Sequence, residues 1–261
     1  MKKHQTRGPE NEERDAIADG IIEGRNAVIE ALRVGTPIDK IFLARGETDA
    51  TLGHIASTAR NQGVVVVEAD RRKLDNMSRT HAHQGVIALA AIREYVDPDD
   101  ILQIARDRGE SPLIVICDEL SDPHNLGAVI RTAECAGAHG IIIPKRRSAG
   151  LTAVVAKTSA GAVSHVPVAR VPNLPSLLKD LKNQGVWIFG ADTAGTIPLY
   201  EADLKGPAAI VIGSEGAGMG RLISETCDFL VSIPMRGKLN SLNASAAAAI
   251  LLYEAVRQRL G

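Results

Sequence analysis

The sequence predicts an α/β protein with a large, mainly parallel sheet domain and a smaller α/β domain before it. The apolar residues switch between helical spacing and short Val/Ile runs bounded by Gly and Asp. In the second half these runs are almost continuously apolar, as in strands that helices cover on both faces. A polar segment, 107–110, separates the two halves. We therefore expect a disordered tail at 1–19, a small domain at 20–95, a linker at 96–110 and a large domain at 111–261.

The smaller domain is predicted from an alternation of strand and helix. Short β-branched runs predict strands, and segments with apolar residues three and four positions apart predict helices. The acidic residues around Pro98 then begin a further helix. The strands are expected over 38–44, 64–68 and 86–91, and the helices over 26–33, 49–61 and near Leu74.

The larger domain is predicted from six apolar runs with helices between them. Its last helix begins near Asn243 or Ser245, and either residue can cap it. The apolar stripe of this helix consists of Ala246, Ile250, Tyr253 and Val256. The strands are expected over 113–117, 141–144, 164–168, 186–190, 208–213 and 229–234, and the other helices over 127–136 and 174–183.

The composition is that of an ordinary globular protein. Hydrophobic residues make up 45% of the chain and charged residues 23%, which argues against a disordered chain, a collagen or a coiled coil. The longest apolar stretch, 244–253, falls short of the roughly 20 residues that a membrane span needs. Residues 1–19 are polar and lack the apolar core of a signal peptide, so we expect a cytoplasmic protein without a membrane partner.

Charge and cysteine content restrict the partners. A net charge of −1 gives no overall field that attracts nucleic acid, so RNA binding would depend on local patches. Two basic runs are candidates, 71–73 and 145–147, although such runs are more often solvated surfaces. The three cysteines form no C-x-x-C pair and are expected to be reduced. His81 and His83 lie close together without a third ligand nearby, so no metal site is predicted.

Three loops at the carboxyl ends of predicted strands carry the polar and glycine residues of interest. Such ends collect the ligand sites of open parallel sheets. The loops span 118–127, 213–218 and 233–245, and the first of them leads into a helix that carries Arg131.

Each loop also has a purely structural interpretation. Asn125 can be a helix cap with Arg131 on the surface, and Glu215 can cap a tight turn. Ser241 and Asn243 can be ordinary loop and cap residues. The glycine-rich loop is not a dinucleotide fingerprint, because that motif belongs to the first strand–helix turn and expects an acid about 20 residues on. Its glycines still let a ligand approach the backbone closely.

Taken together, the three loops resemble the three ordered motifs of the SpoU family. The likeness covers nearly all of 113–261. The first motif is D-P-H-N-L-G at 122–127 with R-T-A at 131–133, the second is I-G-S-E-G at 212–216, and the third is I-P-M at 233–235 with S-L-N-A-S at 241–245.

The smaller domain carries a less specific likeness. G-R-N-A-V-I-E-A-L at 24–32 and H-Q-G-V at 83–86 resemble the small RNA-binding domain, similar to a ribosomal protein, of one SpoU branch. That branch methylates guanosine riboses in ribosomal RNA.

The SpoU resemblance implies a trefoil-knotted (SPOUT) domain, a homodimer with sites near its interface, and S-adenosylmethionine as methyl donor, with no metal required. By motif position, Gly213, Ile233 and Leu242 would bind the donor. The small domain would contact RNA through Arg25, Arg71, Arg72 and Lys73. The catalytic site would consist of Asn125, Arg131, Glu215, Ser241 and Asn243.

The implied reaction is methylation of a ribose 2'-hydroxyl, with a guanosine of large-subunit ribosomal RNA as the expected target. The hydroxyl is a weak nucleophile, so it must be aligned with the donor methyl and lose its proton. The resemblance implies that Arg131 is the base, whereas a guanidinium stays protonated in proteins, which favours a clamp on the target phosphate. Both interpretations stay open.

Three other functions also stay open. They are a transfer-RNA guanosine methyltransferase, a ribosomal-RNA adenosine methyltransferase that confers antibiotic resistance, and a catalytically silent RNA-binding module. The small domain favours a ribosomal substrate, and the completely filled motifs favour an enzyme.

Overall fold

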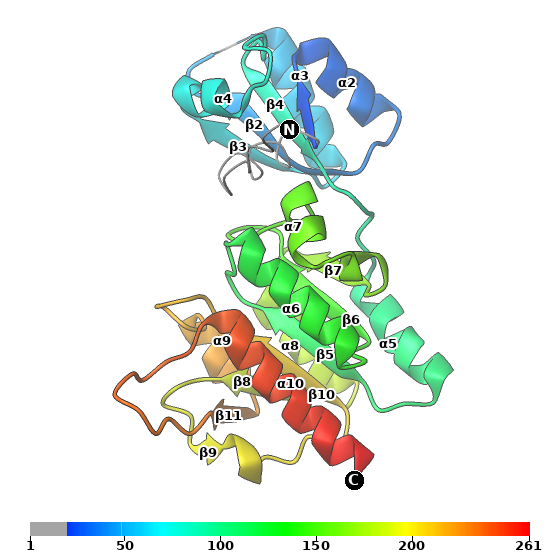
Figure 1. Cartoon of the computed structure of the whole chain (residues 1–261). Coiled ribbons are helices and arrows are strands. Elements are labelled where there is room, and N and C mark those ends of the chain that lie inside the picture. The colour runs from blue at the N-terminus through cyan, green and yellow to red at the C-terminus, as the bar shows by residue number, and fades with distance from the viewer. Residues whose placement is uncertain (1–19, 48) are drawn as a thin grey trace, which may run out of the picture. The chain divides into compact units, whose positions relative to one another are not determined.

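The computed structural model describes residues 20–47 and 49–261 and divides the chain into two compact units (Figure 1). The smaller unit holds the described residues up to Glu94 together with Gly150–Lys157, and the larger unit holds Tyr95–Ala149 and Thr158–Gly261. Each unit has its own sheet. The tail predicted at 1–19 lies outside the described residues.

The smaller unit is a four-stranded sheet between two layers of helix. Side chains alternate along β2, as the pleat requires. Ile41 packs with Val28 and Ile55 of two helices, and the next residue, Phe42, packs on the other face with Leu74. The strands, in the order β1-β4-β2-β3, are β1 (Ile21–Glu23), β2 (Ile38–Ala44), β3 (Val65–Ala69) and β4 (Val86–Ala90), and the helices are α2 (Arg25–Arg33), α3 (Ala50–Asn61) and α4 (Arg71–Met77).

The larger unit is built on a seven-stranded sheet whose paired strands all run parallel where the structure describes them. β5 and β10 are neighbours, with Cys117 opposite Ile212 at their carboxyl ends. In the order β7-β6-β5-β10-β8-β11-β9, the strands are β5 (Leu113–Cys117), β6 (Gly140–Pro144), β7 (Val168–Val171), β8 (Trp187–Ala191), β9 (Ile197–Pro198), β10 (Ala208–Ile212) and β11 (Phe229–Ser232).

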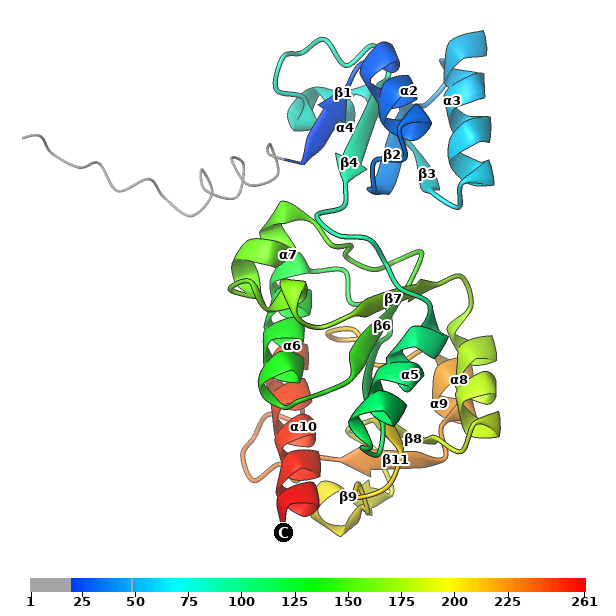
Figure 2. The ribbon, with the colours of Figure 1, turned by 90° about the vertical axis from the view of Figure 1, so that its right-hand side faces the viewer.

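Helices cover both faces of this sheet (Figure 2). One face carries α5 (Pro98–Arg108), α8 (Leu174–Asn183) and α9 (Arg221–Thr226), and the other carries α6 (Pro123–Cys135) and α10 (Ala244–Leu260), which pack against each other. The remaining short pieces are α7 (Ala153–Thr158), η1 (Ala162–Ser164) and η2 (Leu199–Glu201). The mainly parallel sheet and the smaller α/β unit confirm the predicted fold class. No helix in the described ranges is long and apolar enough to cross a membrane.

The segment predicted as a linker, 96–110, differs from that prediction. It carries α5, whose Ile101 and Leu102 are buried in the core of the larger unit with Leu177 of α8. Asp97 and Asp100 form a capping box at its start, and Gly109 ends it in the left-handed conformation. The segment is therefore part of the larger unit.

Two further predictions need correction. The strand expected over 164–168 is displaced, because η1 occupies Ala162–Ser164 and β7 begins only at Val168. On α10 the predicted stripe faces away from the core of its own unit: Ala246 and Tyr253 are exposed, whereas Ala248, Leu251 and Leu252 are buried. This helix therefore has apolar residues on both its buried and its exposed side.

His139, between α6 and β6, is buried in the neutral form. The N–H of Leu113 donates to its Nδ1 at 3.0 Å, so Nδ1 is the acceptor, and Nε2 lies 3.0 Å from a Glu110 carboxylate oxygen. Burial lowers the pKa of His139 from its ordinary value of 6.5, and Glu110 opposes that shift. Because the unfolded chain then binds the proton more readily, the free energy of unfolding falls as the pH drops below 6.5 toward the folded pKa.

We expect the His139 contribution to the loss of unfolding free energy at low pH to disappear in His139→Gln. The amide oxygen of glutamine can still accept the hydrogen bond from the N–H of Leu113. Urea unfolding near about pH 7.5 and about pH 5.5 should show wild type losing more stability than the variant, by up to about 1.4 kcal/mol per pH unit. Equal losses in both proteins would show that His139 is not a source of the pH dependence.

Candidate active site

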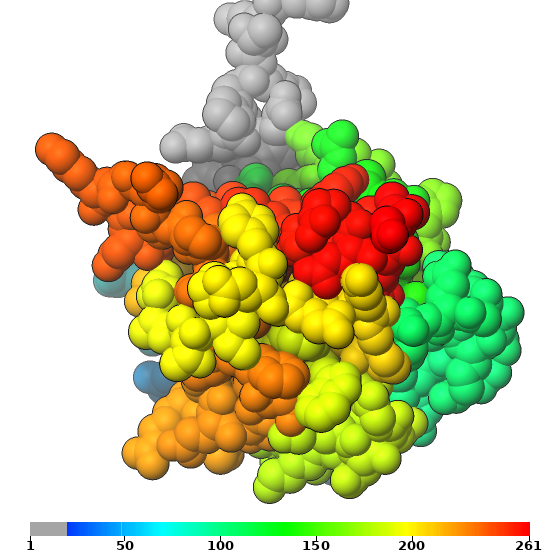
Figure 3. Space-filling view, turned by 90° about the horizontal axis from the view of Figure 1, so that it is seen from below, coloured from blue at the N-terminus to red at the C-terminus, as the bar shows by residue number. Residues whose placement is uncertain are grey.

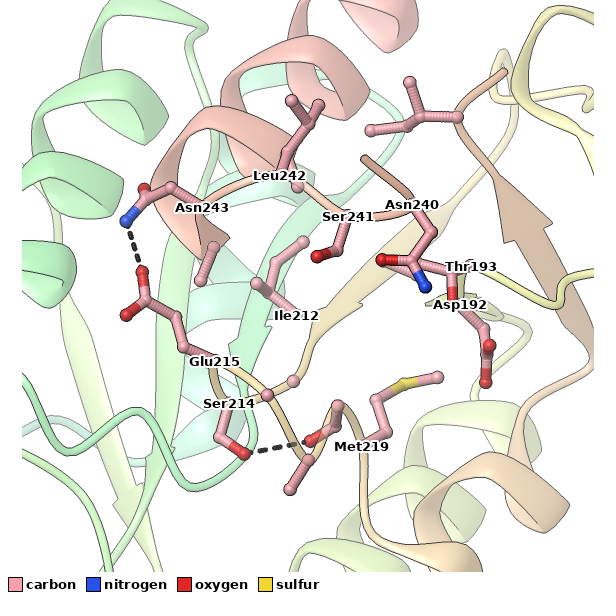
Figure 4. A pocket seen from close by; sticks show the side chains of 18 of the residues that line it. Asp192, Thr193, Ile212, Ser214, Glu215, Met219, Asn240, Ser241, Leu242 and Asn243 are labelled. Carbon is pink, nitrogen blue, oxygen red and sulfur yellow. Dashed lines mark hydrogen bonds between the residues drawn. The ribbon is translucent and has the colours of Figure 1, made fainter. Parts of the chain in front are cut away.

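A cavity opens at the carboxyl ends of β8, β10 and β11 (Figure 4). Its volume of about 520 Å³ lies within the roughly 300–1,000 Å³ typical of small-molecule sites. Residues from four segments line it: 191–193, 212–219, 231–235 and 240–247. Two of the three loops selected from the sequence thus form its walls.

The loop after β10 closes on itself at the cavity. The backbones of Ser214 and Gly218 exchange two hydrogen bonds, of 2.9 and 3.0 Å. Gly216 and Gly218 have φ angles of 84° and 68°, which glycine adopts at little cost. At Gly213 a Cβ would lie 2.2 Å from the Gly218 carbonyl carbon, so no larger residue fits there without moving the loop.

Asp118, directly after β5, anchors this glycine loop. The residue is buried, and its Oδ2 accepts the N–H of Gly220 at 2.7 Å. Its own N–H donates to the carbonyl of Ile212 at 2.7 Å. Burial raises the pKa of Asp118, whereas the hydrogen bond from Gly220 lowers it. The first loop therefore positions a wall of the cavity.

Asn243 connects the three loops. Its Oδ1 accepts the N–H of Ser245 at 2.9 Å and so caps α10. Because the oxygen is occupied, Nδ2 serves as a double donor, to Oδ1 of Asn125 at 2.9 Å and to Oε1 of Glu215. Asn125 in turn donates to Oδ2 of Asp122 at 3.1 Å. We call Asp122, Asn125, Glu215 and Asn243 the amide network.

The opposite side of the cavity carries another carboxylate. Figure 4 shows Asp192 and Thr193 across the cavity from Glu215 and Asn243. The Asp192 carboxylate is held in place by the N–H of Ala194 at 2.8 Å. Apolar lining comes from Ile212, Met219, Val231, Ile233 and Leu242. A cavity with apolar walls and carboxylates on two sides suits a ligand with an apolar part and a positive charge.

Comparison with known proteins identifies the family. The profile of the SpoU rRNA Methylase family matches residues 112–253, and a profile described as RNA 2'-O ribose methyltransferase substrate binding matches residues 21–96. YacO of Bacillus subtilis, described as a TrmH family tRNA/rRNA methyltransferase, is 48% identical over 236 residues, which are 90% of this chain and 94% of YacO. The chain belongs to the SpoU family. This confirms the predicted enzyme class, an RNA methyltransferase.

Solved structures of SpoU enzymes share the fold and hold the expected donor. The SpoU methyltransferase AviRb from Streptomyces viridochromogenes, in complex with S-adenosylmethionine, aligns with a TM-score of 0.60 and 26% identity over 97% of this chain and 99% of its own. An S-adenosylmethionine-bound rRNA methyltransferase from Sinorhizobium meliloti aligns with a TM-score of 0.59 and 26% identity. The alignment covers 97% of this chain and 96% of the Sinorhizobium chain. The two complexes confirm S-adenosylmethionine as a methyl donor of the SpoU family.

In this SpoU chain the cavity unites six of the eight residues predicted for donor binding and catalysis. Asn125 lies outside the lining but is hydrogen-bonded to Asn243. The six that line the cavity are Gly213, Glu215, Ile233, Ser241, Leu242 and Asn243.

Arg131 is the predicted residue that the structure does not bring to the cavity. It lies on the exposed side of α6, about 9 Å along the helix axis from Asn125 at the usual 1.5 Å rise per residue. It forms no hydrogen bond or ion pair with any residue of 20–47 or 49–261. Its side chain is therefore available to a partner outside this part of the chain.

The predicted RNA-binding residues of the smaller unit differ in their surroundings. Arg25 and Arg71 each form an ion pair with a carboxylate, at 2.8 and 2.7 Å. Lys73 lies 4.9 Å from the centre of the Phe42 ring. Arg72 is exposed and makes no such contact within the described residues.

Four residues that shape the site were not among the site residues predicted from the sequence. They are Asp118, Asp122, Asp192 and Thr193. A signal was available for the aspartates at 118 and 192, because each directly follows an apolar strand whose carboxyl end faces the site.

Proposed function

We propose that this enzyme transfers a methyl group from S-adenosylmethionine to a ribose 2'-hydroxyl of RNA, at a guanosine of large-subunit ribosomal RNA. The observation that carries the proposal is the amide network, fixed at one side of the cavity. The descriptions of the two matching profiles, rRNA methylase and 2'-O ribose methyltransferase substrate binding, support the substrate.

The proposed donor site consists of Gly213, Ile233 and Leu242. Gly213 leaves room for the backbone to approach the ligand, and the two aliphatic side chains cover an adenine ring. The Glu215 carboxylate complements the positive sulfonium. When bound, the donor supplies an electrophilic methyl group at this side of the cavity.

The proposed catalytic groups align the hydroxyl and take up its proton. Asn243 fixes one oxygen of Glu215, and the other, Oε2, makes no hydrogen bond within the described residues. Oε2 is therefore placed to accept the hydroxyl proton. Ser241 lines the cavity as a further donor, Asn125 holds Asn243 in its orientation, and Arg131 clamps the phosphate beside the target ribose.

Alkali digestion tests the reaction. The enzyme is incubated with methyl-labelled donor and a large-subunit ribosomal RNA transcript, and the RNA is then hydrolysed. We expect label in alkali-stable dinucleotides, because a 2'-O-methyl group blocks cleavage at that linkage. Label confined to mononucleotides would contradict ribose methylation. In a parallel incubation with transfer RNA, labelling of the transfer RNA but not of the ribosomal transcript would contradict the ribosomal substrate.

We infer a homodimer in which α10 lies at the contact. The exposed side of this helix carries Ala246 and Tyr253, and Leu260 at its end is also exposed. A helix that is apolar on both sides is usually buried on both. Figure 3 shows the end of α10 (red) at the surface beside the segment around residue 200 (yellow). Light scattering at micromolar concentration should give twice the chain mass, and a monomer mass would contradict the dimer.

For the smaller unit we propose that Arg72 and Lys73 contact RNA phosphates. Arg71 can join them, because its exposed ion pair with Glu47 is weak and exchanges partners readily. Arg25 is held more firmly, since its pair with Asp49 is partly buried and its Nε donates to the carbonyl of Gln84 at 3.1 Å, so we propose that it contacts RNA from this fixed position. Replacing Arg72 and Lys73 together by alanine should weaken RNA binding in a filter assay and leave donor affinity unchanged; unchanged RNA binding would contradict this role.

A further inference from the structure

A second polar surface adjoins the amide network, on the loops that follow β5 and β6. These strands are parallel neighbours, so both loops lie at the carboxyl edge of the sheet (Figure 1). The loop after β5 spans 118–122, and the loop after β6 begins with Lys145, Arg146 and Arg147. The mechanism proposed above assigns no role to this basic run.

Side chains and backbone hold the two loops together. Arg147 forms an ion pair with Glu119, with 2.7 Å between Nη1 and Oε1. The hydroxyl of Ser121 donates to the carbonyl of Arg147 at 3.1 Å, and the N–H of Ala149 donates to the carbonyl of Leu120 at 2.9 Å. The loop after β6 is therefore fixed on the loop after β5.

Both members of the ion pair have strained backbones. The φ angles are 54° at Glu119 and 57° at Arg147, in the left-handed region that L residues rarely adopt. Such strain persists where surrounding contacts impose it, and it gathers at ligand sites. The strain favours a functional role for this pair of loops.

Arg146 is the residue of this surface that can meet a ligand. It is exposed and makes no hydrogen bond or ion pair with the residues that the structure describes. The neighbouring loop carries three carboxylates, on Asp118, Glu119 and Asp122, and the basic run at 145–147 matches them in number. Glu119 is paired with Arg147, and Asp118 is buried. The two loops together therefore carry no net negative charge that would repel an anion.

The position of the donor cavity determines where RNA approaches. The cavity lies over β8, β10 and β11, on the far side of the amide network from β6. The loops after β5 and β6 form the side of the network opposite the cavity, so an RNA strand whose ribose reaches the network from that side crosses them. Resting on the proposed function, the geometry points to Arg146 as a phosphate-binding residue for the RNA backbone next to the target ribose. Its planar guanidinium can donate two parallel hydrogen bonds to one phosphate.

Salt-dependent RNA binding tests this assignment. Filter binding of a large-subunit ribosomal RNA transcript is measured between about 0.05 and about 0.3 M KCl. Arg146→Ala should bind about tenfold more weakly. The slope of log affinity against log salt should become shallower by about 0.7 to 0.9, the value for one lost phosphate contact. Arg146→Lys should keep most of the slope, because it keeps the charge. Donor affinity, measured by calorimetry, should not change, because Arg146 does not line the cavity.

Arg108→Ala is the matched control. Arg108 is also exposed and makes no such contact within the described residues, but it lies at the end of α5, just before β5, and so at the amino edge of the sheet. The Arg108→Ala variant should bind RNA as wild type does. An Arg146→Ala variant that matches this control in RNA affinity and in salt dependence overturns the proposal. Because binding is measured without turnover, failure of the alkali test leaves this result intact, and the two proposals fail separately.

Discussion

Replacing Arg131 by alanine should lower single-turnover methylation by at least about 100-fold, the low end for a positioned catalytic group. The reason is the clamp on the target phosphate, which aligns the hydroxyl with the donor methyl. Arg131→Lys should not restore the rate, since a point charge lacks the planar fork of a guanidinium. Stability should change by less than about 0.5 kcal/mol, because the side chain is exposed and makes no contact of its own within the described residues.

The structure makes this a discriminating experiment. Arg131 lies outside the cavity lining, so donor affinity measured by calorimetry should stay at the wild-type value. A decrease in donor affinity would mean that the variant damages the cavity, and the rate loss would then have another cause. Near-normal rates in both Arg131 variants would reduce the residue to a surface cation and remove it from the site.

Much of the site was predictable, because the loops that form it follow the carboxyl ends of strands, where ligand sites gather. Within those loops the SpoU resemblance selected Glu215 and Ser241, and both line the cavity. What the sequence did not reveal is that Asn243 joins two loops while it caps α10. That role depends on β10 lying between β5 and β8 in the sheet. The order of the strands along the chain does not indicate that β5 and β10 are neighbours.

The errors in the predicted fold also arise from tertiary packing that the local sequence does not show. α5 was assigned to a linker because its surroundings are polar, yet Ile101, Leu102 and Ala105 supply one narrow apolar face that the core covers. On α10 the reverse holds, since apolar residues surround the helix and periodicity cannot choose the face that meets the core. Only the packing of α10 on α6 decides that face.

Replacing Gly213 by alanine should cost at least about tenfold in donor affinity, equivalent to about 1.4 kcal/mol. The new Cβ would lie 2.2 Å from the Gly218 carbonyl carbon and 2.3 Å from the Met219 nitrogen, so backbone must move on both sides of the loop. That movement displaces a cavity wall and strains the paired hydrogen bonds of Ser214. Overpacking of this kind also lowers stability, by about 1–3 kcal/mol.

The matched control is Gly206→Ala, because a Cβ there meets nothing within 4 Å and the backbone is not left-handed. It should bind the donor as wild type does. Calorimetry gives the affinities, and urea unfolding shows that each variant is folded under the binding conditions. Should Gly213→Ala itself fail to fold, Asp118→Ala tests the same wall from outside the cavity lining, since it removes the carboxylate that accepts the N–H of Gly220. Wild-type donor affinity in the folded Gly213→Ala protein would show that the glycine loop is not a wall of the donor site, because a bound ligand in contact with that loop would respond to its displacement.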